Sequence, residues 1–276
     1  MMAHTTAARQ ALHDTLGIGF KELGRRLEGR AAIVTGAAQG IGRAIARRLA
    51  LEGADQILTD LESQEDKLRA LVEELREVGV RAEYVVGDAT QSESIRAVCD
   101  AALEKFKKID ILVNNVGGGI LVPFMEKTEE MWQTEIDRNL TPTLRYCQMV
   151  LPHMVKQRYG RVVMIGAESV RNGLWEHASY NAAKGGVHGL TTGLARELAP
   201  HTITVNTIAP SIVATERVQS LIEAGAERAT RYIGLIPMAR AATMGEVAAA
   251  VAFVASDDAS FITGQVISVN GGSSML

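Results

Sequence analysis

The chain has 276 residues, of which 47% are hydrophobic and 22% are charged, and its formal net charge is −3. This length suits one large α/β domain or two small ones, and the composition is typical of a soluble globular protein. The 29 basic residues are scattered among 32 acidic ones, which argues against nucleic acid or a membrane surface as a partner. The start of the chain lacks an apolar leader segment and no apolar run approaches about 18 residues, so we expect a cytoplasmic protein without a membrane span. Cys99 and Cys147 lie far apart and predict buried thiols, with no disulfide framework and no metal site.

Residues 1–28 are compatible with a helix but precede the first strand signal, so we interpret them as an N-terminal extension on the surface or on a neighbouring subunit. Residues 29–276 contain no linker rich in Pro, Gly or Ser and are expected to form one domain. Seven short apolar runs predict strands: "RAAIVT", "QILTD", "AEYVVGD", "IDILVNN", "GRVVMIG", "TITVNTIAP" and "QVISVNGG". Stretches between them, such as Glu65–Val78 and Ser92–Lys107, repeat apolar residues every three or four positions, as amphipathic helices do. This alternation predicts an α/β fold with a doubly wound, seven-stranded parallel sheet and helices on both faces.

The first predicted strand runs directly into a helix through the turn "TGAAQGIG", Thr35 to Gly42. Gly36, Gly40 and Gly42 permit a tight turn, close approach of backbone N–H groups to a pyrophosphate, and close packing of helix on strand. The helix N-terminus adds a partial positive charge. An ordinary strand-to-helix turn is the alternative, but the position between the first strand and helix of a βαβ unit favours a dinucleotide site.

Asp60 ends the second predicted strand, 18 residues beyond Gly42. A carboxylate at this strand end can accept hydrogen bonds from both adenosine ribose hydroxyls and would repel a 2′-phosphate. No Lys or Arg occurs at positions 37–39 or 61–62 to attract that phosphate. The pattern therefore predicts NAD in preference to NADP, and a solvated surface aspartate is the alternative.

Two further strand ends carry polar residues. Asp88, in "GDAT", is placed to meet the adenine edge, and Asn114–Gly119, "NNVGGG", is expected to form a flexible loop. Ligands of open α/β sheets bind at the carboxyl ends of the strands. Because Gly36, Asp60, Asp88 and Asn115 all fall at that edge, one dinucleotide explains them better than four unrelated turns.

Tyr180 and Lys184 are four residues apart in the predicted helix "SYNAAKGGVHGLTTGLAREL" and therefore share a face. A free phenol titrates near pH 10. A nearby ammonium and a positive nicotinamide ring would favour the phenolate and move its pKa towards the working pH. Tyr180 would then take the proton of an alcohol whose hydride passes to NAD⁺. Chance matches to this spacing are common, so two ordinary helix side chains are the alternative.

Together these motifs resemble those of the short-chain dehydrogenase/reductase family. The family's TGxxxGxG turn matches Thr35–Gly42, its NNxG motif matches Asn114–Gly117, and its YxxxK pair matches Tyr180–Lys184. Its PGxxxT segment is similar to "PSIVAT", with Ser211 for glycine, and "ITGQVISVNGG" has Asn270 where aspartate is usual. The resemblance covers about residues 29–272. It implies a single-domain Rossmann fold, NAD as cofactor, and an alcohol or ketone as the small-molecule substrate.

The resemblance also implies roles for individual side chains. Tyr180 and Lys184 are catalytic, and Asn139 helps to hold a water that links the lysine to solvent. Pro142 lacks an N–H and predicts a distortion beside Asn139, which in the alternative interpretation is bonded only within a kinked helix. The start of the lid holds the nicotinamide amide. The expected cofactor-binding residues are Gly36, Gln39, Gly40, Ile41, Asp60, Asp88, Ala89, Asn115, Gly117, Tyr180, Lys184, Pro210, Val213 and Thr215.

The family places its catalytic serine just beyond the fifth strand, usually 13 residues before the tyrosine. This chain has Ala167 at that position, and alanine cannot donate a hydrogen bond to a substrate oxygen. Three explanations stay open: a deliberate serine-to-alanine substitution, Ser169 acting in its place through a loop shift, and a natural member without catalysis.

Residues at about 211–240 are expected to form the substrate lid. With Ile120, Trp175 and Tyr232, the lid is apolar and suits a cyclic or hydrophobic alcohol, which resembles family members that oxidise ring alcohols or cis-dihydrodiols in aromatic and alicyclic catabolism. Three arginines could meet a substrate carboxylate, although solvated charges are the expected interpretation. They are Arg171, Arg217 and Arg231.

Two alternatives from the same resemblance stay open. One is a 3-oxoacyl-carrier-protein reductase, against which Asp60 argues because those enzymes usually prefer NADPH. The other is an NAD-binding member without turnover. Family members commonly pair the helices that correspond to Met131–Tyr159 and Tyr180–Leu198 across a two-fold axis, so the resemblance implies a homotetramer, with a dimer as the alternative.

Overall fold

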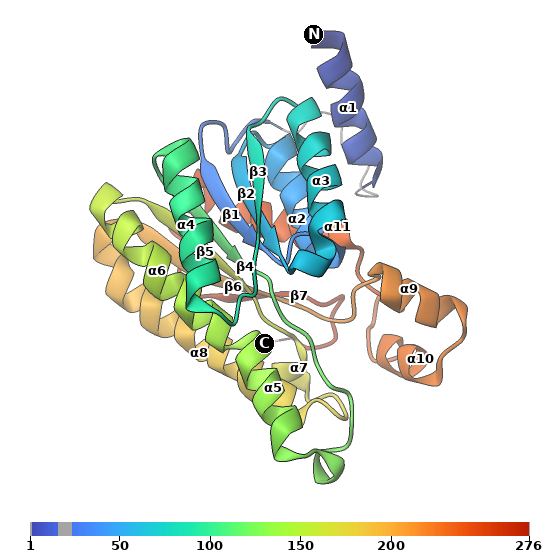
Figure 1. Ribbon diagram of the computed structural model, residues 1–276. Helices are drawn as coiled ribbons and strands as arrows, with labels where there is room; N and C mark the ends of the chain where they lie inside the picture. The colour runs from blue at the N-terminus through green and yellow to red at the C-terminus, as the bar shows by residue number, and fades with distance from the viewer. Residues whose placement is uncertain (1, 16–23, 276) are drawn as a thin grey trace.

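The computed structural model describes residues 2–15 and 24–275 of the chain (Figure 1). Each predicted apolar run contains a strand: β1 Ala31–Thr35, β2 Asp55–Asp60, β3 Ala82–Val86, β4 Ile111–Asn114, β5 Gly160–Ile165, β6 Ile203–Pro210 and β7 Val266–Val269. All neighbouring strands pair in parallel, in the order β3-β2-β1-β4-β5-β6-β7. The predicted seven-stranded sheet is confirmed. The strand order reverses between β1 and β4, where open α/β sheets bind their ligands.

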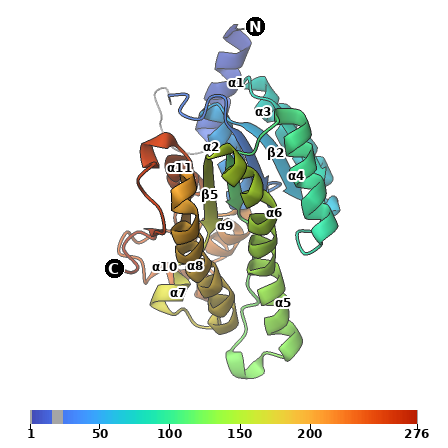
Figure 2. The ribbon, with the colours of Figure 1, turned by 90° about the vertical axis from the view of Figure 1, so that its left-hand side faces the viewer.

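Helices cover both faces of the sheet, as predicted (Figures 1 and 2). One face packs against α2 (Gly40–Leu51), α3 (Glu65–Glu77) and α11 (Met244–Val254), and the other against α4 (Ser92–Phe106), α6 (Thr141–Gln157) and α8 (Ala178–Leu198). Each face has its own cluster of buried apolar side chains, because strands buried on both sides alternate their residues between two cores. Cys99 and Cys147 are both buried, as expected, and burial raises the pKa of each thiol to about 12.

The N-terminal segment forms α1 (Met2–Thr15), which packs against the chain's own domain beside α2 and α3. Leu12 joins the buried cluster of that face, and the Arg9 guanidinium donates to the backbone oxygen of Leu51 at 2.9 Å. Residues 16–23 of the predicted extension lie outside the described residues. Within the described ranges, no helix has the length and apolar character needed to cross a membrane.

The stretch Met131–Tyr159, expected as one long helix, is two helices. The first, α5 (Glu129–Asn139), is separated from α6 by Leu140 alone. Pro142 lies in the first turn of α6, where its missing N–H costs nothing, and this accounts for the interruption. The distortion predicted beside Asn139 is therefore present as a break between two helices.

The remaining helices surround the open end of the sheet. They are α7 (Ser169–Asn172), which follows β5, and the pair α9 (Glu216–Glu223) and α10 (Glu227–Ile233), which follows β6. Figure 1 shows α9 and α10 projecting from the body of the domain beside the carboxyl ends of the strands. This pair lies within the segment expected to be the lid.

Candidate active site

A cavity of about 1420 Å³ lies at the carboxyl ends of the strands. It exceeds the roughly 300–1,000 Å³ of a usual small-molecule site, which leaves space for more than one small molecule. Its lining includes all but one of the expected cofactor-binding residues. They are Gly36, Gln39, Ile41, Asp60, Asp88, Ala89, Asn115, Gly117, Tyr180, Lys184, Pro210, Val213 and Thr215. The exception, Gly40, lies behind the lining, where a Cβ atom would come within 3.5 Å of the Thr215 side chain.

The turn after β1 requires glycine at each of the three predicted positions. Gly36 and Gly40 have φ values of +62° and +56°, which side chains with a Cβ rarely adopt. A Cβ on Gly42 would lie 2.0 Å from the backbone oxygen of Gly36. The start of α2 can therefore approach β1 closely, and Gly36, Gln39 and Ile41 of this turn border the cavity.

Asp60 is held by the backbone on both sides. Its two carboxylate oxygens accept hydrogen bonds from the N–H groups of Ala38, at 3.0 Å, and Leu61, at 2.9 Å. Positions 37–39 and 61–62 hold no Lys or Arg, but Lys67 on α3 donates to the Gln39 side chain at 3.1 Å. Lys67 is exposed and also donates to Gln64, so the helix brings in a cation that positions 37–39 and 61–62 do not contain.

The loop after β4, predicted to be flexible, is tied down at two points. The Asn115 side-chain amide donates to the backbone oxygens of Thr35 and Gly36, both at 3.0 Å. Further along, the Asn139 side chain accepts from the N–H of Gly118 and donates to its oxygen, both at 3.0 Å. Asn139 is fully buried and contacts the site through the backbone of this loop.

Asp88 lies just after β3. It is exposed, and its carboxylate accepts a hydrogen bond from the N–H of Thr90.

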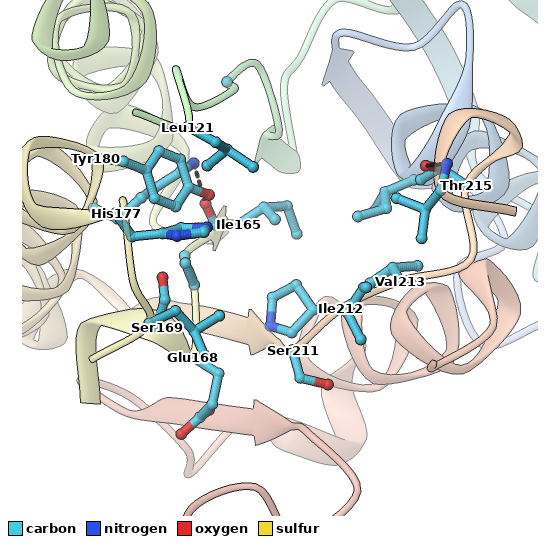
Figure 3. Close-up of a pocket in the computed structure, with 18 of the residues that line it drawn as sticks. Leu121, Ile165, Glu168, Ser169, His177, Tyr180, Ser211, Ile212, Val213 and Thr215 are labelled. Carbon is cyan, nitrogen blue, oxygen red and sulfur yellow. Dashed lines mark hydrogen bonds between the residues drawn. The ribbon is translucent and has the colours of Figure 1, made fainter. Parts of the chain in front are cut away.

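Tyr180 and Lys184 lie on the face of α8 that borders the cavity. Figure 3 shows the Tyr180 ring at this border, next to His177. The buried Lys184 ammonium donates to the backbone oxygen of Ile165 at 2.8 Å, and burial lowers its pKa to about 8. Burial and the carboxylate of Glu135 raise the pKa of Tyr180. The lowering expected from the sequence requires a positive nicotinamide beside the ring, and it stays a prediction.

Ala167 follows the end of β5, is buried and lines the cavity. In the family that the sequence resembles, a serine hydroxyl is usual at this position. Its N–H donates to Nε2 of His188 at 3.4 Å, and burial lowers the pKa of His188 to about 4, so that imidazole stays neutral. The Ser169 hydroxyl donates to the Asn181 side chain at 2.6 Å. Figure 3 shows it pointing to the side of the cavity where Tyr180 lies, whereas the Glu168 carboxylate points away.

Aromatic rings connect Tyr180 to the lid. His177 packs edge-on against both Tyr180 and Tyr232, with ring centroids 5.6 Å apart in each pair. Tyr232 on α10 stacks with Trp175 and donates to its backbone oxygen at 3.0 Å. Figure 3 shows Tyr180 and His177 facing Val213 and Thr215 across the cavity. Aromatic side chains therefore form a connected group from Tyr180 to α10 along one side of the cavity.

The three arginines considered for a substrate carboxylate have different environments. Arg171 donates to the Ser268 hydroxyl and the Val266 oxygen of β7, which occupies its guanidinium. Arg217 is exposed and does not line the cavity, whereas Arg231 lines it and lies 3.3 Å over the Trp175 ring. Of the three, Arg231 is the one that a ligand in the cavity can reach.

Sequence reasoning missed a buried polar cluster beside Tyr180. The Lys127 ammonium lies 2.6 Å from the Glu135 carboxylate and 2.7 Å from the hydroxyl of Ser179. Glu135 precedes Asn139 by one helical turn, so its spacing from a recognised motif residue was the available signal. Its partner Lys127 comes from a separate segment, and no local pattern indicates that pairing.

Comparisons with known proteins agree with this geometry. A family model described as enoyl-(acyl carrier protein) reductase matches residues 36–274. The 2,3-dihydroxy-2,3-dihydro-p-cumate dehydrogenase of Pseudomonas putida is 47% identical over 251 residues, covering 91% of this chain and 96% of that protein. The 3-oxoacyl-[acyl-carrier-protein] reductase of Vibrio cholerae is 39% identical, covering 91% of this chain and 99% of that protein. The crystal structure of gox2181 has a TM-score of 0.85 at 38% identity, covering 90% of this chain and 97% of that chain.

Fold, motifs and relatives together define a nicotinamide-dependent oxidoreductase with a Rossmann fold. The chain belongs to the short-chain dehydrogenase/reductase family, and it acts on CH–OH groups.

Proposed function

We propose that this protein is an NAD-dependent dehydrogenase of cyclic secondary alcohols, with a cis-dihydrodiol of an aromatic ring as its substrate. The observation that carries the proposal is the single cavity that joins Asp60 and the glycine turn to Tyr180 and the aromatic lid residues. The dihydrodiol dehydrogenase relative at 47% identity supports the same substrate class. Trp175, His177 and Tyr232 all line the cavity, and aromatic side chains suit an apolar ring substrate.

The residues present fit a nicotinamide dinucleotide. The glycine turn leaves room for a pyrophosphate, and the fixed Asp60 carboxylate suits the adenosine ribose hydroxyls. Lys184 at the far end lies where it can contact the nicotinamide ribose, and the segment from Val213 to Thr215 suits the carboxamide. Bound NAD⁺ would supply the acceptor for the hydride that leaves the alcohol carbon.

Two side chains of the protein, those of Tyr180 and Lys184, handle the proton of the alcohol. Tyr180 as phenolate takes the hydroxyl proton while the C–H hydride leaves, so a ketone and protonated Tyr180 result. The Lys184 ammonium favours the phenolate by its charge. Asn139 holds the Gly118 backbone beside this pair, and a water near it would link Lys184 to solvent. The pocket has no hydroxyl donor at Ala167, so the alcohol oxygen is polarised less than in a serine-containing site.

A ketoreductase acting on 3-oxoacyl thioesters is the second candidate, supported by the relative from Vibrio cholerae. The two functions are separated by supplying a cis-dihydrodiol with NAD⁺ and a 3-oxoacyl thioester with NADPH to the same protein. We expect turnover of the diol to exceed that of the thioester. A preference for the thioester would overturn the proposal, and cofactor binding without turnover of either, also after Ala167→Ser, would favour a non-catalytic member.

Cofactor selectivity is expected to depend on Asp60. Asp60→Ala should weaken NAD binding and narrow the gap to NADP, because the ribose hydroxyls lose an acceptor and the 2′-phosphate loses a repelling charge. Lys67→Gln is the control variant, which removes the nearby positive charge. It should weaken NADP binding and leave NAD binding unchanged. Titration calorimetry with both cofactors measures this, and equal affinity of the unmodified protein for NAD and NADP would contradict the assignment.

The acid/base role is tested at Tyr180. Tyr180→Phe keeps the ring but removes the ionisable group, so NAD should still bind while turnover falls by roughly 100- to 10,000-fold. Lys184→Met should impair both, since the lysine also lies against the ribose site. Steady-state rates and cofactor affinity are measured in a variant with detectable activity. Unchanged oxidation by the Phe variant would remove Tyr180 from the mechanism.

Restoring a hydroxyl at Ala167 is expected to raise turnover. A missing preorganised donor costs roughly 100- to 1,000-fold, or about 3–4 kcal/mol, so Ala167→Ser should recover a factor of that order with little change in NAD affinity. Ser169→Ala is the companion variant. If the serine form is no faster while Ser169→Ala abolishes activity, then Ser169 is the donor and its hydrogen bond to Asn181 must break on substrate binding.

We also propose a homotetramer, with pairing through α5, α6 and α8. Leu144 on α6 is a large apolar side chain that is 44% exposed, which fits a covered surface in an assembly. Light scattering at micromolar concentration should give the mass of four chains, or of two for the dimer alternative, and a monomer would contradict the proposal. A cytoplasmic location stays a prediction from the sequence.

A further inference from the structure

A wholly buried ion pair lies next to the active-site tyrosine, and none of the roles proposed above uses it. The side chains of Lys127 and Glu135 are both 0% exposed, and their charged atoms are 2.6 Å apart. Lys127 follows the short 3₁₀ helix η2 (Phe124–Glu126), Glu135 lies on α5, and Ser179 lies at the start of α8 immediately before Tyr180. The Ser179 hydroxyl hydrogen-bonds to both Lys127 and Glu135. Three separate segments therefore meet at this cluster.

Stability alone does not account for such a pair. Removing two charges from water costs several kcal/mol for each ion, and apolar replacements of similar volume are often neutral or stabilising. Here every oxygen of the carboxylate has a donor: Oε1 accepts from the N–H of Ile120 at 2.7 Å, and Oε2 accepts from Lys127 and Ser179. Full satisfaction of this kind fixes the geometry of the groups around it.

The cluster fixes two segments that lie against Tyr180: the loop after β4 and the first turn of α8. Glu135 and Asn139 are one turn apart on α5 and hold two alternate residues of the loop after β4, Ile120 and Gly118. That loop lies directly against Tyr180, because a Cβ atom on Gly119 would come within 3.3 Å of the tyrosine ring. Ser179 fixes the other side, one residue before Tyr180 in the chain. The cluster thus sets the loop and the tyrosine relative to each other.

We propose that Lys127, Glu135 and Ser179 form a positioning cluster for the reaction: Glu135 clamps the 117–121 loop to the N-terminal turn of α8 and so fixes Tyr180 against the alcohol side of the cavity. Glu135 is a positioning residue, since it acts through Ile120 and Ser179. The inference concerns the family's oxidoreductase chemistry and does not depend on which alcohol is the substrate.

The cluster also contributes charge near Tyr180. The titratable and charged groups around the phenol are Lys184 on α8, His177 at the N-cap of α8, Glu135 on α5 and Lys127 beside η2. The Tyr232 ring on α10 packs against His177. Burial and Glu135 raise the pKa of Tyr180, and burial lowers the pKa of His177, which leaves the imidazole neutral. Removing the Glu135 charge therefore lowers the pKa of Tyr180. Because burial raises the same pKa, exposure of the ring would lower it too, so the shift is assigned to the charge only where the backbone protection around Tyr180 is unchanged.

The first experiment compares Glu135→Gln with Glu130→Gln, which removes the same charge from an exposed position on the same helix. The pH dependence of Tyr180 is followed by NMR of tyrosine labelled at Cζ, with and without NAD⁺, and Tyr180→Phe assigns the signal. We expect the Tyr180 midpoint to move to lower pH in Glu135→Gln and to stay in place in Glu130→Gln. A Tyr180 midpoint that is the same in both variants, measured with NAD⁺ bound, contradicts the electrostatic part of the proposal.

The second experiment tests the clamp with the double variant Lys127→Met/Glu135→Leu, which removes both charges and avoids a lone buried ion. We expect the N–H of Ile120 to lose protection from hydrogen exchange, and kcat to fall on the order of 10- to 100-fold with a smaller change in KM for the cofactor. A folded double variant with unchanged Ile120 protection and kcat overturns the proposal. If the protein turns over no alcohol, the proposed function has failed, but the exchange and titration results still decide the clamp.

Discussion

The organisation of the site depends on the contact between β1 and β4, the strands at which the sheet order reverses. The Thr35 hydroxyl donates to the Val113 oxygen and accepts the N–H of Asn115 at 2.9 Å. The Asn115 amide then caps the oxygens of Thr35 and Gly36. A Cβ atom on Gly42 would lie 2.6 Å from this amide, so the glycine turn makes room for Asn115 as well as for a phosphate. The glycine turn, where a pyrophosphate is proposed to bind, and the loop after β4 are therefore held by the same side chain, that of Asn115.

The second support is α5, which ends beside the same loop. Asn115 fixes the first part of the loop to β1, and Asn139 and Glu135 fix the later part to α5. Only a few residues separate these hydrogen bonds. A shift of β1 or of α5 would therefore move Gly119, which lies against the Tyr180 ring. This explains why the break at Leu140 matters: it ends α5 at the residue that holds Gly118, and it lets α6 pack on the sheet independently.

Most of the fold could be predicted because each strand and helix has a local signal. Short apolar runs bounded by turn residues gave the sheet, and the glycine spacing located the turn after β1. The pairing of Lys127 with Glu135 and the approach of Lys67 to Gln39 could not be predicted, since each joins segments that no periodicity relates. The burial of Tyr180, which raises its pKa, could not be predicted either, because burial depends on the packed structure and not on the spacing of two side chains.

Burial shifts the pKa values of the titratable groups in the site. It lowers the pKa of Lys184 to about 8 and that of His188 to about 4, and it raises the pKa of Tyr180, so each group is pushed towards its neutral form. A charge that enters such a space acts more strongly than in water, because few dipoles screen it. The positive nicotinamide of the proposed cofactor is such a charge, and it favours the phenolate that the chain alone disfavours. The proposed proton removal by Tyr180 would therefore be coupled to cofactor occupancy, because without the cofactor burial and Glu135 raise the pKa of the phenol.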